Sequence, residues 1–286
     1  MNDIGTIGVV GAGTMGRGIA QVAAGVPGAR VVLLDAKAEA LVSARAELSS
    51  ELSRLQAKGL IDERERERRG AAVLCSTSFE DLTTCDLIIE AVPELDKVKQ
   101  ATLRNISEAA APSAIIASNT SSMSITRLST SVDGRQRFFG VHFFNPVARM
   151  SLVEVIRSPL SDRELERGLV GFLATGMGKS PLVVDDRPGF VVNALLVPLL
   201  LAAARMVEAG YATSAQIDDG MKLGAGHPMG PLALSDLIGL DVLRDIGDAM
   251  YAETKDAALI VPNNVRRLVD AGHLGRKTGK GFFDHS

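Results

Sequence analysis

The chain has 286 residues, of which 46% are hydrophobic and 23% are charged, and its formal net charge is −3. This length accommodates two domains, and the small negative charge shows no bias toward nucleic acid or an anionic membrane surface. The longest apolar stretch, residues 194–204, contains Pro198 and is too short to span a bilayer. The two cysteines, Cys75 and Cys85, lack metal-type spacing, and no secretory signal is visible. We therefore expect a cytoplasmic protein with reduced core thiols, no nucleic-acid partner and no membrane contact.

A glycine-rich turn follows the first strand pattern. Residues 7–10 are apolar like a buried strand, and they lead directly into Gly11-Ala12-Gly13-Thr14-Met15-Gly16 and a helical pattern. Strand, G-x-G-x-x-G and helix in this order predict a dinucleotide site, in which the glycines allow the tight turn, the approach of a pyrophosphate and close helix packing. A second apolar strand at 30–34 ends in Asp35, which we expect to bond the adenosine ribose hydroxyls. Asp35 indicates NAD, because it would repel a 2′-phosphate, whereas Lys37 leaves NADP as the alternative.

Strand-like and helix-like segments alternate as far as about residue 185, and the remaining pattern is almost wholly helical. This order predicts a Rossmann-type, doubly wound, mostly parallel sheet in an NAD-binding domain at 1–186, followed by an all-α domain at 187–286. A helical pattern at 38–60 and a charge run at 63–69 predict a helical hairpin inserted between the second and third strands. The charge run is typical of a solvated helix face, and we assign it no binding role.

A polar loop follows a later strand pattern. A helix near 94–110 precedes the strand-like segment 114–117, which leads into Ser118-Asn119-Thr120-Ser121-Ser122. Because ligands of open α/β sheets bind at the carboxyl ends of the strands, we expect Asn119 and Ser121 to lie near the cofactor. The alternative is that these side chains only satisfy the backbone of their own loop.

A histidine and a glutamate lie twelve residues apart in two apolar segments. His142 stands in Val141-His142-Phe143-Phe144-Asn145-Pro146, and Glu154 stands in Ser151-Leu152-Val153-Glu154-Val155. The Asn-Pro step between them is a turn signal, so a hairpin would bring the imidazole beside the carboxylate. A carboxylate in that place fixes the imidazole tautomer and favours its protonated form. The pair therefore predicts a general base with its orienter, and the alternative is a satisfied core histidine.

The second domain begins after a turn. Asp185-Asp186-Arg187-Pro188-Gly189 predicts the domain boundary, and Asn193 follows as one amide among apolar neighbours, where it could bond a substrate oxygen. The apolar helical segment 194–206 indicates a dimerisation interface, and the alternative is a self-contained core. Further helices are expected near 214–223, 231–237 and 242–254.

Taken together, these motifs resemble the L-3-hydroxyacyl-CoA dehydrogenase family over the whole chain, and within it the short, monofunctional 3-hydroxybutyryl-CoA dehydrogenases. The matching segments are Gly11 to Gly16, Ser118 to Ser122, His142 to Pro146, Glu154, Pro188 to Asn193, Gly226-His227-Pro228-Met229-Gly230-Pro231 with its continuation to Asp241, and Gly275 to Phe283.

The resemblance implies NAD-dependent oxidation of an (S)-3-hydroxyacyl-CoA, and its reverse, by a homodimer. It implies that His142 is the general base, that Glu154 is its partner, and that Ser121 and Asn193 bind and orient the thioester. It further implies cofactor contacts from Glu94, Lys99, Asn145 and Lys277, and a CoA contact from Lys58. A position where some relatives carry a CoA-contacting serine is Glu51 here. No metal is required, because hydride leaves directly and the four histidines are not at ligand spacing.

Three alternatives remain open at this point. The substrate could be a hydroxyacyl group on a carrier protein or a free sugar acid, since the reacting residues would be the same. The chain could also be a non-catalytic NAD-binding protein, or a structural protein that has kept the fold.

Overall fold

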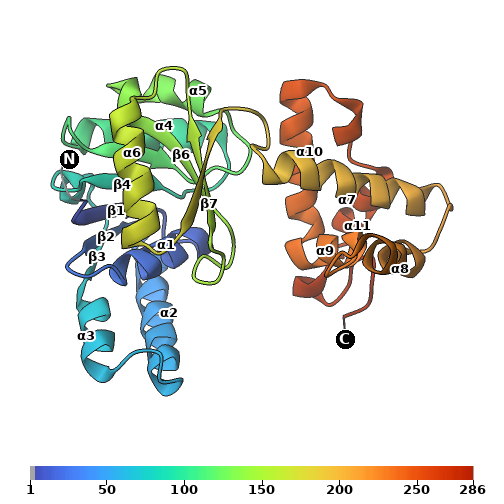
Figure 1. The fold of residues 1–286 in the computed structure, drawn as a ribbon, viewed down its shortest axis with the longest axis horizontal. Coiled ribbons are helices and arrows are strands. Elements are labelled where there is room, and N and C mark those ends of the chain that lie inside the picture. The colour runs from blue at the N-terminus through green and yellow to red at the C-terminus, as the bar shows by residue number, and fades with distance from the viewer. Residues whose placement is uncertain (1–3, 286) are drawn as a thin grey trace. The chain divides into compact units, whose positions relative to one another are not determined.

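The computed structural model describes residues 4–285 and divides into two compact units, Met1–Asp186 and Arg187–Ser286 (Figure 1). The first unit is built on an eight-stranded sheet flanked by helices, and the second is helical. Each unit buries its own cluster of apolar side chains. The predicted fold class, a Rossmann-type sheet domain followed by an all-α domain, is confirmed.

The strand order of the sheet is β3-β2-β1-β4-β5-β6-β7-β8. All neighbouring strands are parallel except β6 and β7, which pair antiparallel. The central strands β1, β4 and β5 are buried along their whole length and mostly apolar, as expected for a sheet with helices on both faces. The strand order reverses between β1 and β4, where ligands of open α/β sheets bind. The strands are β1 (Thr6–Val10), β2 (Arg30–Leu34), β3 (Val73–Ser76), β4 (Leu87–Glu90), β5 (Ile115–Ser118), β6 (Phe138–Phe143), β7 (Leu152–Arg157) and β8 (Ser180–Asp185).

The helices of the first unit occupy the expected segments with shifted ends. The helix expected at 38–60 ends at Ala57, because Gly59 adopts a φ of +69° that a helix cannot continue. The helix expected from 94 begins at Asp96, and the strand expected at 114–117 lies one residue later. The helices are α1 (Thr14–Ala24), α2 (Ala38–Ala57), α3 (Glu63–Ala71), α4 (Asp96–Ala109), α5 (Ile125–Leu128) and α6 (Arg163–Gly171), with short helical turns η1 (Phe79–Leu82), η2 (Ser129–Ser131), η3 (Arg135–Arg137) and η4 (Phe172–Gly176).

The inserted hairpin of α2 and α3 projects from the sheet (Figure 1). No residue of α3 is buried, as the solvated charge run predicts. The run has a structural role that its composition does not indicate, because Arg68 donates hydrogen bonds to the carbonyls of residues 24–26 at 3.2 Å. Glu65 holds Arg68 and Arg69 at 2.7 Å each. These bonds fasten the hairpin to the turn between α1 and β2.

The second unit packs its helices around α7, whose side chains Val197, Leu200 and Leu201 are buried. The carboxyl-terminal segment is closed by Asp236, which accepts hydrogen bonds from the amides of Phe282 and Phe283 at 2.9 Å. The helices are α7 (Val192–Glu208), α8 (Ser214–Ala225), α9 (Pro231–Ile238), α10 (Leu240–Thr254) and α11 (Asn263–Asp270), with turns η5 (Ala257–Leu259) and η6 (Arg276–Thr278).

Both cysteine thiols are free, with Cys75 half-buried and Cys85 buried. Burial raises the pKa of Cys85 to about 12, so this thiol stays protonated and unreactive at neutral pH. Among the described residues, no helix combines the length and apolar character needed to cross a bilayer.

Candidate active site

The turn between β1 and α1 has the geometry of an anion cradle. Gly11 has a φ of +110°, and a Cβ on it would lie 2.7 Å from the carbonyl oxygen of Ala91. A Cβ on Gly16 would lie 1.7 Å from the carbonyl oxygen of Gly11, so the helix packs against the turn with no space for a side chain. A Cβ on Gly13 would meet nothing within 4 Å. The open side at Gly13, at the amino end of α1, therefore fits the pyrophosphate of a dinucleotide.

Asp35 lies beside this turn. One carboxylate oxygen accepts a hydrogen bond from the amide of Ala12 at 2.8 Å, and the other accepts one from the amide of Lys37 at 2.9 Å. The carboxylate is thereby fixed at the carboxyl end of β2, next to the glycine turn. This is the place that an acid bonding the adenosine ribose must occupy.

A buried charge network, which sequence reasoning missed, lies at the ends of β4 and β5. Glu90 is 0% exposed and Lys99 is 1% exposed, and they form an ion pair at 2.8 Å. Ser118 donates a hydrogen bond of 2.6 Å to the other oxygen of Glu90. The Lys99 ammonium also lies 3.6 Å from Glu94. The expected cofactor contact of Lys99 stays a prediction. In the structure its ammonium lies closer to Glu90 than to Glu94.

Glu94 contacts the polar loop after β5, which the sequence did not predict, and the cofactor roles of both stay predictions. The Glu94 carboxylate accepts hydrogen bonds from the amide of Ser121 at 2.7 Å and from the hydroxyl of Thr120 at 3.0 Å. Asn119 accepts a hydrogen bond of 2.9 Å from the amide of Phe143 at the end of β6. The loop is thus joined on one side to Glu94 and on the other to the strand that carries the histidine.

His142 and Glu154 face each other in the antiparallel register of β6 and β7. The Nδ1 atom of His142 lies 2.8 Å from the Oε2 atom of Glu154, and the two side chains are 8% and 0% exposed. The expected juxtaposition of imidazole and carboxylate is therefore confirmed. In the neutral imidazole a proton on Nδ1 is held by the carboxylate, which leaves Nε2 as the basic nitrogen. The ring of Phe144 packs against the imidazole with 4.4 Å between centroids.

A cavity of about 1150 Å³ lies within the first unit. Its walls come from α1, α2, the loop between β6 and β7, and residues 175–179. Asn145 and Lys58, which sequence reasoning assigned to the cofactor and to CoA, both line it. The charged side chains that line the cavity are Arg17, Arg54, Lys58, Arg69, Arg149 and Lys179, together with Glu47 and Glu51. The excess of cations over carboxylates makes this cavity suited to an anionic ligand.

Asn193 and Lys277 belong to the helical unit. Asn193 is 8% exposed and stands in the first turn of α7. The Lys277 ammonium lies 2.5 and 2.6 Å from the two carboxylate oxygens of Asp241. The roles of Asn193 and Lys277 toward substrate and cofactor stay predictions.

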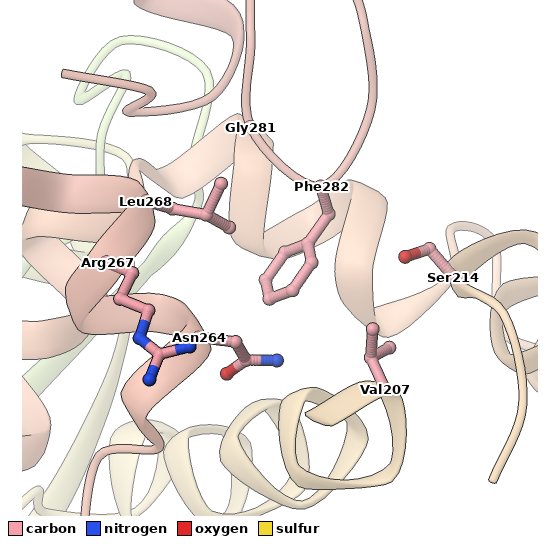
Figure 2. Close-up of a pocket in the computed structure, with 7 residues that line it drawn as sticks. All are labelled: Val207, Ser214, Asn264, Arg267, Leu268, Gly281 and Phe282. Carbon is pink, nitrogen blue, oxygen red and sulfur yellow. The ribbon is translucent and has the colours of Figure 1, made fainter. Parts of the chain in front are cut away.

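A smaller cavity of about 400 Å³ lies in the same unit (Figure 2). Figure 2 shows Phe282, Leu268 and Val207 around it, with the polar ends of Arg267 and Asn264 at its edge. The Asn264 amide donates to the carbonyl of Ala204 and accepts from the amide of Val265, both at 2.8 Å. We assign this cavity no ligand, because that amide serves the packing of α11 on α7. Within the described part of the chain, no group of three or more His, Cys, Asp or Glu side chains is placed to hold a metal.

Comparison with known proteins covers both units. The family model for the NAD binding domain of 3-hydroxyacyl-CoA dehydrogenase matches residues 6–187, and the model for the C-terminal domain matches residues 189–285. A 3-hydroxybutyryl-CoA dehydrogenase of Mycobacterium tuberculosis is 43% identical over 281 residues, which cover 98% of each chain. The mitochondrial hydroxyacyl-coenzyme A dehydrogenase of Mus musculus is 39% identical over 97% of this chain and 90% of its own.

Among solved structures, the crystal structure of (S)-3-hydroxybutyryl-CoA dehydrogenase from Ralstonia eutropha has a TM-score of 0.94 and 42% identity, covering 99% of this chain and 100% of that one. The resemblance drawn from the sequence motifs is thereby confirmed over the whole chain.

Proposed function

Because this chain belongs to the 3-hydroxyacyl-CoA dehydrogenase family, whose members are NAD-dependent oxidoreductases, we propose that it interconverts (S)-3-hydroxybutyryl-CoA and acetoacetyl-CoA. The observation that carries this proposal is the buried pair of His142 and Glu154, with 2.8 Å between Nδ1 and Oε2. An imidazole with a carboxylate on one nitrogen can take a proton at the other, which is what oxidation of an alcohol requires. The short acyl chain and the stereochemistry rest on the names of the relatives.

In this proposal the proton of the reaction is transferred between the substrate and His142. In the oxidative direction, Nε2 of His142 accepts the proton of the C3 hydroxyl as the carbonyl forms. Glu154 stabilises the imidazolium that results, because its carboxylate remains hydrogen-bonded to Nδ1. Bound NAD supplies the hydride acceptor. In the reductive direction, the protonated His142 returns its proton to the C3 oxygen.

The residues of the first unit fit NAD. The open side of the turn at Gly13 receives the pyrophosphate, with Ala12, Thr14 and Met15 completing the cradle between the two crowded glycines. Asp35 receives the ribose hydroxyls and disfavours a 2′-phosphate, so NADH is preferred over NADPH. Further cofactor contacts are proposed for the loop residues Asn119 and Ser121, and for Glu94, Lys99, Asn145 and Lys277.

The thioester substrate is proposed to bind through Ser121 and Asn193 near the reacting carbon. Its CoA portion is proposed to enter the cavity of the first unit, which Lys58 lines from the C-cap position of α2. The Glu51 carboxylate lines the same cavity and lies 3.3 Å from Arg54. That ion pair offsets the negative charge which replaces the serine of some relatives, and so leaves the net charge of the wall positive.

Exposed apolar side chains in the helical unit support a homodimer. Leu195, Tyr211 and Leu223 are 74%, 80% and 88% exposed. Large apolar side chains exposed on one domain are typical of an interface. Light scattering coupled to size exclusion should give twice the chain mass of 30.1 kDa, and a mass of one chain would contradict the dimer.

The test of function is the initial rate of NADH oxidation with acetoacetyl-CoA, measured beside NADPH and beside the pantetheine thioester of the same acyl group. We expect fast turnover with NADH and the CoA thioester, and slow turnover in the other two arms. Equal rates with both thioesters would favour a carrier-bound substrate. Binding of NADH without turnover of either thioester would favour a sugar acid or a non-catalytic NAD-binding protein.

A matched pair of variants sharpens the assignment of the CoA portion. Lys58→Met should raise the KM for acetoacetyl-CoA by roughly tenfold, because one charge-assisted contact is lost, and should leave the KM for the pantetheine thioester unchanged. Lys222→Met removes a lysine of α8 that is paired with Asp219 at 2.8 Å, and serves as the control. Equal KM changes for both thioesters would contradict the role of Lys58.

A further inference from the structure

One buried cation of the first unit, which also lines the cavity proposed for CoA, takes no part in the proton transfer derived above. Lys179 stands just before β8 and is 9% exposed. Desolvation by burial lowers the pKa of its ammonium. A buried charge without a carboxylate partner is costly, and an apolar side chain of the same length would avoid that cost. The hydrogen bonds that the ammonium makes must therefore offset the cost of burying its charge.

The ammonium holds the loop between β6 and β7. It donates hydrogen bonds to the carbonyl oxygens of Val147 at 2.5 Å and Met150 at 2.8 Å. The backbone of Lys179 is itself anchored, because its amide donates to the carbonyl of Leu173 at 2.9 Å. The amide of Ser180 donates to the carbonyl of Ser151 at 2.8 Å. The hydrogen bonds of the Lys179 ammonium therefore lie next to the start of the pairing between β7 and β8.

The same loop touches the helix of the dinucleotide turn. The side chain of Val147 packs on Gly18 of α1, where an added Cβ would lie 2.8 Å from a methyl group of Val147. The loop also carries Asn145, and it joins the two strands that present His142 and Glu154. One loop thus connects the proposed cofactor helix, the proposed base and its orienter.

We propose that Lys179 is a positioning residue, which clamps the loop between β6 and β7 and thereby sets the geometry of the catalytic hairpin against the cofactor helix. The structural half of this inference concerns the loop alone, and the kinetic half rests on the dehydrogenase function proposed above. Lysine suits the task because its ammonium carries three N–H donors, and two of them can bond the carbonyl oxygens of Val147 and Met150 at the same time.

The loop offers a direct readout in hydrogen exchange. The amides of Arg149 and Met150 donate to the carbonyl of Pro146 at 2.9 and 3.0 Å. In Lys179→Met, exchange across residues 145–151 should accelerate by at least about tenfold, because the loop opens more often once its carbonyls lose the ammonium. The rest of the first unit should keep its wild-type protection. Lys179→Arg, which restores charge and donors, should recover part of the protection.

Kinetics provide the second readout. Lys179→Met should lower kcat by about tenfold or more, because misplacement of the reacting groups costs rate even when binding is kept. The dissociation constant of NADH, followed by its fluorescence, should change by less than about threefold. Lys179→Arg should restore part of kcat, and Lys222→Met should behave as wild type. If Lys179→Met does not fold, Lys179→Gln keeps a donor at the site and takes its place in both measurements.

Three results would overturn the proposal. The first is unchanged exchange in the loop of a folded variant that lacks the ammonium. The second is a uniform loss of protection across the first unit, which would make Lys179 a general stabiliser. The third is a change in KM or NADH affinity with kcat unaltered. If the wild-type protein fails to turn over acetoacetyl-CoA, the proposed function fails, while the exchange comparison still decides whether the clamp exists.

Discussion

Two glutamates of the same sheet are both completely buried, yet their partners give them different capacities. Glu90 at the end of β4 faces the ammonium of Lys99, and Glu154 in β7 faces the imidazole of His142, each at 2.8 Å. Lysine keeps its proton at neutral pH, so the first pair is a fixed pair of charges. Histidine gains and loses a proton in that range, so the second pair can take part in proton transfer. The difference shows that burial of a carboxylate does not by itself mark a catalytic site. The residue paired with the carboxylate determines whether the pair can transfer a proton.

The largest effect should come from removing the titratable partner. In His142→Gln we expect kcat to fall by about 10⁴-fold, at the upper end of the range for loss of a general base. The NADH dissociation constant should stay near the wild-type value, because the dinucleotide turn is built from other strands. Stopped-flow or steady-state NADH oxidation, together with NADH fluorescence titration, measures both. Parallel loss of NADH binding would indicate a structural histidine.

Breaking the fixed pair should cost stability instead. Lys99→Met leaves the fully buried Glu90 without its cation, and we expect a loss of about 3–5 kcal/mol in the free energy of unfolding. Urea denaturation followed by circular dichroism gives the change. The double variant Lys99→Met, Glu90→Leu should be less destabilised than the single one, because no charge is then left unpaired. A single variant as stable as wild type would contradict the fixed-pair account.

Neutralising the orienter should have an intermediate effect. Glu154→Gln keeps the size of the side chain but removes the charge that stabilises the imidazolium, and we expect kcat to fall by roughly 10²-fold. The pH profile of kcat should also change, because the charged partner of the proposed base is then neutral. A near-normal kcat with an unchanged pH profile would refute the role of Glu154. Glu90→Gln provides the contrasting measurement, in which stability should change more than the pH profile.

The smallest effect should come from a third carboxylate, at the surface. Hydrogen bonds from Arg68 and then Arg69 lower the pKa of Glu65 from 4.5 to about 2. A depressed carboxyl pKa stabilises the folded state above pH 4.5, and this stabilisation is lost as the pH falls from 4.5 toward 2. Glu65→Gln should therefore reduce stability by less than about 1 kcal/mol at pH 7, and the difference should shrink at pH 3. A difference that grows at low pH would contradict this sign.

The features predicted correctly from the sequence are those that depend on residues close together in the chain. The apolar runs and the glycine turn predicted the strands around the cofactor, and the turn at Asn145-Pro146 predicted that His142 and Glu154 would meet. Glu90 was not recognised, because it follows an apolar strand and its partners come from α4 and β5. Lys179 was not recognised for a similar reason, since a lysine in a glycine-containing turn looks solvated in the sequence. Its burial depends on the loop that folds over it.

The antiparallel register of β6 and β7 limits which changes of chain length this family can accept. Side chains on a strand alternate between the two faces of the sheet, and His142 is paired directly with Glu154. Insertion or deletion of a single residue within either strand would send one member of the pair to the opposite face. Length changes in evolution should therefore be excluded from these two strands and restricted in the loop that joins them, where the carbonyl groups must still reach Lys179. Homologues with different surface turns can share the chemistry only if the histidine and the glutamate still face each other on the same side of the sheet.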